Sequence, residues 1–376
     1  MSFDVISGVV KRVSGNQYVV RTVERSYQRG SVEVMVAPEM VRRFRIVEGA
    51  GVVGEVERKK GRARLVSIES IGGMKPEDFV GRPRFGDLVA IDPEQRFDLG
   101  GCGQESMRIV ELISPIGKGT RQLIVSPPKA GKTVLLEQLV QAIRHCSPQT
   151  KTIVLLVDER PEEVTIFRRV VPGAEVAAST IDNKTDEHIE LVELILAHVQ
   201  IELECGKEVV LLIDSLTRVA RAFNNQVSRR GGRRGHTMSG GLEAGVLEVP
   251  RRLFGLARNI ENGGSLTVIA TCLIKTGSRM DQLIFEEFKG TGNSEIFLDR
   301  SLAEARIFPA IDIAASGTRK EAVLYGEDDM RGLAALRRVL SSYSNREGVE
   351  AMLKLLKKYP DNKVFLESMG AGMRNI

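Results

Sequence analysis

The chain has 376 residues, of which 42% are apolar, enough for one large packed domain and a smaller second one. Its formal net charge of +5 is modest for this length and does not by itself indicate a nucleic-acid-binding protein. We expect a cytoplasmic protein with no membrane association, because neither a signal peptide nor an apolar run of about 18 residues is evident. The four cysteines and four histidines are scattered without metal-ligand or disulfide spacing, which favours free thiols.

Residues 1–70 contain short β-branched runs such as QYVVRTV and GVVGEVE, separated by turns with glycine or charged residues. This pattern predicts a small all-β barrel. Residues 71–105 carry Gly, Pro and Asp with little periodicity, which predicts a connector.

From residue 106 to 376 the pattern changes to apolar strands that alternate with helical segments. The predicted strands are RQLIVS, TIVLLVDE, EVVLLIDS and SLTVIAT. Continuous apolar runs of this kind are typical of strands buried on both faces, so we expect an α/β domain with a mostly parallel sheet. Two amphipathic helices are predicted near the C-terminus, and we assign them to packing.

The segment SPPKAGKT, residues 126–133, follows the first of these strands. Its end has the Gly131, Lys132 and Thr133 of a phosphate-binding loop, in which backbone N–H groups hold phosphates, lysine meets the outer phosphates and the hydroxyl ligates Mg²⁺. Ser126 replaces the usual first glycine, and two prolines stiffen the bend. We therefore predict a site for a nucleoside triphosphate and Mg²⁺.

Acidic residues follow two further strands. Asp214 ends one apolar run, where such an enzyme needs a carboxylate for Mg²⁺. Asp158, Glu159 and Arg160 end another, at the edge where open α/β sheets bind ligands. Either acid could polarise the attacking water, and Glu159 is favoured because it lies just beyond the strand. The alternative is a solvated turn.

These features resemble the Rho family of hexameric transcription termination factors across about residues 105–325. The segments that carry the resemblance are SPIGKG, PPKAGKT, LLVDERPEEVT, IDSLTRVARAFN, GGSLTVIAT, EEFKGTGN, RIFPAID and SGTRKE. The resemblance implies a RecA-like ATPase domain behind an OB or cold-shock-like barrel. It also implies ATP and Mg²⁺, a homohexameric ring, translocation on single-stranded RNA, and RNA polymerase and elongation factors as partners.

The family's roles can be placed on residues of this chain. Lys132 and Thr133 would bind phosphate and Mg²⁺, Glu159 would activate water, and Asp214 would complete the Mg²⁺ shell. Arg160 and Arg218 would sense the γ-phosphate, Arg319 would act as an arginine finger on a neighbouring subunit's nucleotide, and Phe308 would stack near the adenine. The remaining nucleotide contacts would be Gly117, Lys118, Gly119, Thr120, Arg121, Gln122, Lys129, Ala130, Gly131 and Val134. Without the resemblance, Phe308 could simply be a core residue.

Two loops would face RNA in the centre of such a ring. One contains Thr237, Met238, Ser239, Gly240 and Gly241, and the other contains Lys289, Gly290, Thr291 and Gly292. The alternative for both is a turn that needs glycine for its backbone conformation. The preceding SRRGGRRGH, residues 228–236, resembles an insertion and is either a solvated loop or an arm for phosphates.

The barrel differs more from the family. Gln17, Val19 and Arg64 stand where we expect aromatic side chains that stack on bases, and Tyr27, with Tyr18 as a further candidate, remains. Arg21, Arg62 and Arg64 could still contact phosphates. We therefore expect weak, base-indifferent binding of RNA to the barrel.

Two other functions stay open from the sequence. One is a paralogue of the family whose motor has been retargeted and whose barrel binds protein. The other is a ring ATPase that transports DNA or protein.

Overall fold

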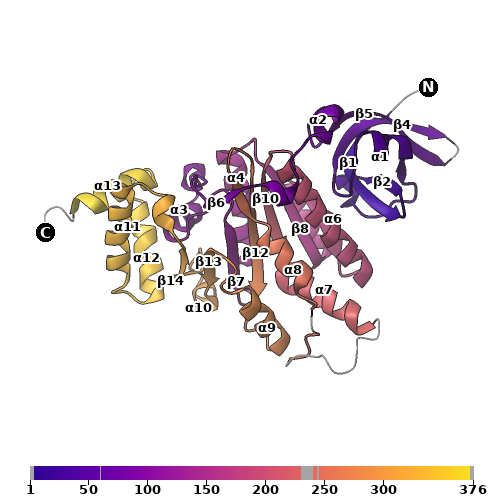
Figure 1. Cartoon of the computed structure of the whole chain (residues 1–376). Helices are drawn as coiled ribbons and strands as arrows, with labels where there is room; N and C mark the ends of the chain where they lie inside the picture. The colour runs from indigo at the N-terminus through magenta and orange to yellow at the C-terminus, as the bar shows by residue number, and fades with distance from the viewer. Residues whose placement is uncertain (1–3, 60, 230–239, 244, 373–376) are drawn as a thin grey trace.

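The structure is a computed structural model that describes residues 4–59, 61–229, 240–243 and 245–372. A small barrel formed by the N-terminal residues lies at one end of the molecule, a large sheet with helices occupies the centre, and the C-terminal helices lie at the other end (Figure 1). The predicted fold class, a RecA-like α/β domain preceded by a small β barrel, is confirmed.

The barrel closes in the order β1-β2-β3-β5-β4. Its interior is filled by inward-facing aliphatic side chains that are fully buried, such as Val10, Val56 and Leu65. This alternation of inward apolar and outward polar residues is what a closed barrel requires. All neighbouring strands of the barrel are antiparallel except β3 and β5, which are parallel. The strands are β1 (Asp4–Ser14), β2 (Gln17–Arg21), β3 (Val34–Val36), β4 (Gly51–Lys59) and β5 (Arg62–Ile71), and helix α1 (Pro38–Arg43) lies between β3 and β4.

The central sheet has nine strands, with the path β14-β13-β7-β12-β10-β8-β9. Off this path, β11 pairs with β12, and β6 pairs with β11. From β13 to β9 all neighbours are parallel, whereas β13 and β14 are antiparallel. The strands are β6 (Ala90–Ile91), β7 (Arg121–Ser126), β8 (Lys151–Glu159), β9 (Glu175–Thr180), β10 (Glu208–Asp214), β11 (Arg258–Ile260), β12 (Ser265–Leu273), β13 (Ser294–Leu298) and β14 (Ile311–Thr318).

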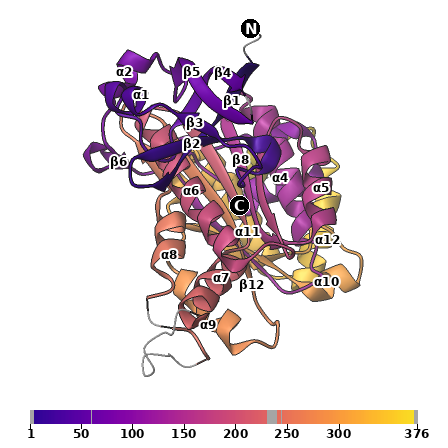
Figure 2. The same ribbon diagram turned by 90° about the vertical axis from the view of Figure 1, so that its right-hand side faces the viewer.

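Helices cover both faces of the sheet, which explains why its strands are apolar throughout. Figure 2 shows α6 to α9 on one side and α4 and α5 on the other. Along β7, Leu123 and Val125 pack into the core on the first side, whereas Ile124 packs into the core on the second. The helices are α2 (Pro76–Val80), α3 (Glu105–Ile113), α4 (Lys132–Cys146), α5 (Pro161–Val170), α6 (Thr185–Glu204), α7 (Leu216–Arg229), α8 (Glu248–Gly255), α9 (Arg279–Phe288), α10 (Arg300–Glu304), α11 (Glu327–Leu340), α12 (Asn345–Leu356) and α13 (Asn362–Gly372).

The segment between barrel and motor is more ordered than a connector. Its strand β6 pairs with β11 and so extends the sheet, and Phe79 in α2 is fully buried beside the barrel core. No helix in the described part of the chain combines the length and the apolar composition that a membrane crossing requires.

Candidate active site

The phosphate-binding loop follows β7 and leads into α4. Gly131 caps α4 with a φ of +84°, and a Cβ at this position would lie 3.1 Å from the Phe308 ring. Only glycine suits this position without strain, because a side chain disfavours a positive φ. Lys132 and Thr133 are the first two residues of α4, so the helix N-terminus and its free N–H groups face the place where an anion binds.

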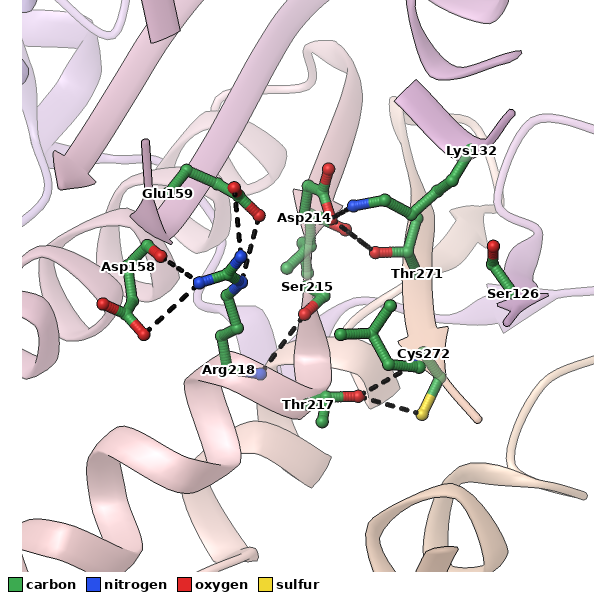
Figure 3. Close-up of polar contacts among 12 residues, drawn as sticks. Ser126, Lys132, Asp158, Glu159, Asp214, Ser215, Thr217, Arg218, Thr271 and Cys272 are labelled. Atoms are coloured by element: carbon green, nitrogen blue, oxygen red, sulfur yellow. Dashed lines mark hydrogen bonds and ion pairs between the residues drawn. The ribbon is translucent and has the colours of Figure 1, made fainter. Parts of the chain in front are cut away.

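Asp214 ends β10 next to this loop and is 1% exposed. Its carboxylate forms an ion pair with the Lys132 ammonium group and accepts a hydrogen bond of 2.8 Å from the Thr271 hydroxyl (Figure 3). Thr271 lies in β12, the neighbouring strand. The Thr133 hydroxyl and the Asp214 carboxylate are the hard oxygen donors that Mg²⁺ prefers, so these residues fit that ion. Among the described residues, no group of three or more His, Cys, Asp and Glu side chains could hold a metal ion.

Glu159 ends β8, the strand on the other side of β10. Its side chain is buried, and burial, together with the nearby Asp214 carboxylate, raises its pKa to about 7. Arg218 of α7 holds it in place, with a distance of 3.1 Å between Arg218 Nε and Glu159 Oε1. Arg218 also donates to the Asp158 carbonyl oxygen (Figure 3). A carboxylate at this edge of the sheet whose pKa lies near neutral pH is suited to accept a proton.

Asp158 is the less suitable base. Its side chain is 41% exposed, and its backbone has a φ of +56°. Arg160 is exposed at the N-cap of α5, directly beyond Glu159. The strand ends therefore bring together Lys132, Glu159 and Asp214, with Arg218 behind Glu159.

Phe308 lies beside the phosphate-binding loop and is 48% exposed, so it is a surface ring and not a core residue. It lines a pocket of about 480 Å³ together with Ala130, Gly131 and Val134. An exposed aromatic ring next to a phosphate-binding loop can stack on a planar base.

Residues 117–122 lie at the opposite end of β7 from the phosphate-binding loop. Gln122 is near the beginning of β7, where it pairs with Ile269 of β12, whereas the phosphate-binding loop follows the end of β7. Four residue steps from Gln122 to Ser126 correspond to roughly 13 Å of strand. Lys118 is mostly buried and forms an ion pair of 2.6 Å with Glu208 at the start of β10. The prediction that this segment lines the nucleotide pocket with Lys129 therefore does not hold within one chain.

Arg319 lies at the same edge as that segment. Thr318 pairs with Ser294, which in turn pairs with Gln122. Arg319 is exposed and has no ion pair within the described residues. It lies beside Arg121, whose pKa is lowered by burial and then by the Arg319 charge. Arg319 is thus separated by the length of β7 from the phosphate-binding loop of its own chain.

The two predicted RNA loops both adjoin α9. Gly240 has a φ of +83°, and a Cβ there would lie 2.7 Å from the Leu283 side chain. Lys289 follows the end of the same helix and is exposed, and Gly290 has a φ of +86°. Thr237, Met238 and Ser239, and most of the arginine-rich segment 228–236, lie outside the described residues. The positive φ angles agree with the alternative that glycine is needed for the turns. The contact of these loops with RNA stays a prediction.

Two barrel residues are not where RNA could reach them. Tyr27 is 3% exposed, and its hydroxyl donates a 2.8 Å hydrogen bond to Glu175 at the start of β9. Arg21 is buried between Glu33 at 3.3 Å and Glu190 at 3.1 Å. Both were predicted to bind RNA, and the structure corrects this, because they dock the barrel on the motor domain.

Other barrel residues remain on the surface. Arg62 and Arg64 line a groove of about 510 Å³ that also includes Arg29 and Met35. Val19 is 1% exposed, so it belongs to the interior and is not a surface position that has lost an aromatic ring. Gln17 is exposed, as expected.

Sequence reasoning missed Thr271, which supports Asp214. A signal was present, because Thr271 is a polar residue near the C-terminal end of its strand, at the same edge of the sheet as Asp214.

A parallel sheet with a phosphate-binding loop, a buried acid at the end of a neighbouring strand and a second acid one strand further is a P-loop ATPase domain. Accordingly, the model of the ATP synthase alpha/beta family, nucleotide-binding domain, matches residues 106–318. A type III secretion system ATPase of known structure is 26% identical with a TM-score of 0.61, covering 69% of this chain and 72% of its own.

The full-length comparison is more specific. Transcription termination factor Rho of Chromobacterium violaceum is 43% identical over 357 residues, which are 93% of this chain and 84% of that protein. Rho of Aquifex aeolicus is 44% identical over 374 residues, which are 97% of this chain and 85% of that protein. The similarity therefore includes the barrel as well as the motor. The chain belongs to the Rho family, and it is an ATP-hydrolysing enzyme.

Proposed function

We propose that this chain terminates transcription as a homohexameric, Mg²⁺-dependent ATPase that moves along single-stranded RNA and acts on RNA polymerase and its elongation factors. The observation that carries the proposal is the division of the site between two edges of the sheet. Lys132, Glu159 and Asp214 lie at one edge, and Arg319 lies at the other without an ionic partner in the described residues. An arginine in that place can reach a triphosphate only on another subunit.

Each residue has a task in hydrolysis. Lys132 neutralises the outer phosphates, while Glu159 accepts a proton from the attacking water. Arg218 keeps the Glu159 carboxylate oriented toward the phosphate-binding loop. Bound Mg²⁺ would be held by Thr133 and Asp214 and would stabilise negative charge on the phosphates. Arg319 of a neighbouring subunit supplies the last positive charge, so hydrolysis depends on the ring.

RNA would meet two surfaces. The loops that adjoin α9, around Gly240 and Lys289, would contact the strand during movement. The barrel groove with Arg62 and Arg64 would hold RNA through phosphates, since Arg62 and Arg64 are exposed on β5.

The test is release of a nascent transcript from a stalled RNA polymerase complex. We expect the wild-type chain with ATP to release the transcript, and Lys132→Ala to release none. Equal release by both proteins would contradict the proposal.

A transport ATPase of the type III secretion kind is the second candidate, because its motor domain has a similar structure. The Rho relatives are more similar and extend across the barrel, which favours RNA as the polymer that is moved.

A further inference from the structure

The segment between barrel and motor, residues 71–105, contacts the loop that carries Arg319. This loop, residues 319–325, begins directly after β14 and ends shortly before α11, and we call it the Arg319 loop. Pro93 lines a cavity of about 270 Å³ together with Arg319 and Leu324. Hydrolysis as described above uses Arg319 but none of the residues that face its loop from the segment 71–105.

A glycine permits the close approach of the two segments. A Cβ at Gly117 would lie 2.7 Å from the Leu324 side chain and 2.9 Å from the Pro93 side chain. Both distances are too short for a side chain at this position, so the residue between the two segments must be glycine. The approach of the Arg319 loop to the segment 71–105 is therefore part of the fold.

Arg96 joins the two segments through its guanidinium group. Its Nη1 donates a 3.3 Å hydrogen bond to the Leu324 carbonyl oxygen, and its Cζ lies 4.2 Å from the centre of the Tyr325 ring. Tyr325 is 4% exposed, and its hydroxyl donates a 2.6 Å hydrogen bond to the Glu111 carbonyl oxygen in α3. A planar guanidinium can lie on a ring and donate from its edge at the same time, so Arg96 fixes the end of the Arg319 loop.

Arg96 is itself held in place. Its Nε lies 3.8 Å from the buried Glu111 carboxylate, and its Nη1 lies 3.7 Å from the Asp329 carboxylate at the start of α11. Its backbone pairs with Gly117 in an antiparallel bridge. Arg96 is therefore a fixed support for the loop and not a mobile surface side chain.

The other end of the Arg319 loop is held by the sheet. The Arg319 backbone N–H donates a 2.8 Å hydrogen bond to the Asn293 carbonyl oxygen, whereas the Arg319 side chain is exposed. Lys320 also forms an ion pair of 2.7 Å with Asp92, but both side chains are exposed, and such pairs contribute little. Arg96 is thus the main side chain from the segment 71–105 that restrains the loop.

We propose that Arg96 is a positioning residue that holds the Arg319 loop so that Arg319 reaches the nucleotide of a neighbouring subunit. This inference rests on the proposed function, in which Arg319 acts in trans. A charge that is displaced by about 1 Å stabilises the transition state much less, although it touches the same nucleotide. Loss of Arg96 therefore lowers the rate of hydrolysis next door and leaves the ATP site of its own subunit intact.

The first experiment measures kcat and KM for ATP with the full-length ring and saturating single-stranded RNA. Arg96→Met removes the hydrogen bond to Leu324, so kcat should fall about tenfold while KM stays within about twofold of the wild-type value. Arg144→Met is the matched control, because Arg144 is also half-buried and donates to a loop carbonyl oxygen, that of Gly173 at 2.9 Å. The Arg144 variant should keep the wild-type kcat.

Mixed rings show on which subunit Arg96 acts. An Arg96→Met subunit keeps its own Glu159, and a Glu159→Gln subunit keeps its own Arg319 loop. In equal mixtures of the two, half of the Arg96→Met subunits have a neighbour with an intact loop, so activity per Arg96→Met subunit should rise about fivefold. Mixing Arg96→Met with Arg319→Ala should give no rise, because both variants lack a working loop. A defect of folding or of the variant's own ATP site would not produce this difference.

The reference is the mixture of Arg319→Ala with Glu159→Gln. If this mixture regains activity but Arg96→Met with Glu159→Gln does not rise, Arg96 does not act through Arg319, and the inference alone is overturned. If the reference mixture stays inactive, action in trans fails and the inference fails with it. Wild-type kinetics of Arg96→Met, or a raised KM at unchanged kcat, also overturn the inference. Tyr325→Leu removes the ring from the loop and is judged by the same criteria, so a misfolded Arg96→Met protein does not protect the proposal.

Discussion

The ionisation of Glu159 should set the pH dependence of ATP hydrolysis. Burial and the Asp214 carboxylate raise the pKa of Glu159 to about 7 in the free protein. A general base works only in its ionised form, so kcat/KM for ATP should fall as the pH falls through about 7. One pH unit below the pKa, roughly a tenth of Glu159 is ionised, and kcat/KM should be about tenfold below its plateau.

A substitution of Glu163 tests whether Glu159 is the group that titrates. Its negative charge is among the causes that raise the pKa of Glu159, and it lies on the first turn of α5, outside the phosphate-binding loop. Glu163→Gln removes that charge, so the acid limb should move to lower pH while the plateau stays unchanged. ATP also titrates in this range, but its own ionisation does not respond to a mutation. The assay is phosphate release at low ATP over about pH 5.5 to 8.5. A limb at the same pH in both proteins, or a flat profile, would refute the assignment of Glu159 as the base.

Glu159→Gln should abolish turnover while ATP still binds, because the carboxylate acts on the water; hydrolysis at the wild-type rate would exclude Glu159 as the base. Lys132→Ala should weaken both ATP binding, measured by titration, and turnover, and unchanged affinity would argue against its phosphate contact. Arg319→Ala should bind ATP without hydrolysing it, and mixed rings with Glu159→Gln subunits should regain some activity, since one interface can pair an intact Glu159 with an intact neighbouring Arg319. Mixed rings that remain inactive at all ratios would contradict action in trans. Arg62→Ala and Arg64→Ala should each reduce the slope of log affinity for RNA against log salt by about 0.7, and an unchanged slope would show that the barrel groove does not contact phosphates.

The edge of the sheet that carries Lys132, Glu159 and Asp214 was predictable because these residues follow or end apolar strands. Glu159 and Asp214 end such runs, and Lys132 follows another through the phosphate-binding loop, so parallel strands bring these residues together. The segment 117–122 is similarly close to Ser126 in the sequence, yet β7 separates the two. Proximity along a chain does not say on which edge of a sheet a residue lies.

The barrel residues were harder to place for a different reason. Tyr27 and Arg21 have the chemistry of RNA ligands, but their partners Glu175 and Glu190 belong to the motor domain and are 148 and 169 residues away in sequence. Nothing in the local pattern reveals that the barrel docks there.

The most direct test of an RNA-dependent motor is the rate of ATP hydrolysis with and without a defined single-stranded RNA, at low salt and with Mg²⁺ present. Hydrolysis should be slow without RNA and strongly stimulated by RNA, with no comparable stimulation by a protein substrate or by double-stranded DNA. Hydrolysis that is equally fast with and without RNA would contradict an RNA-dependent motor, even if every residue of the ATP site acts as described.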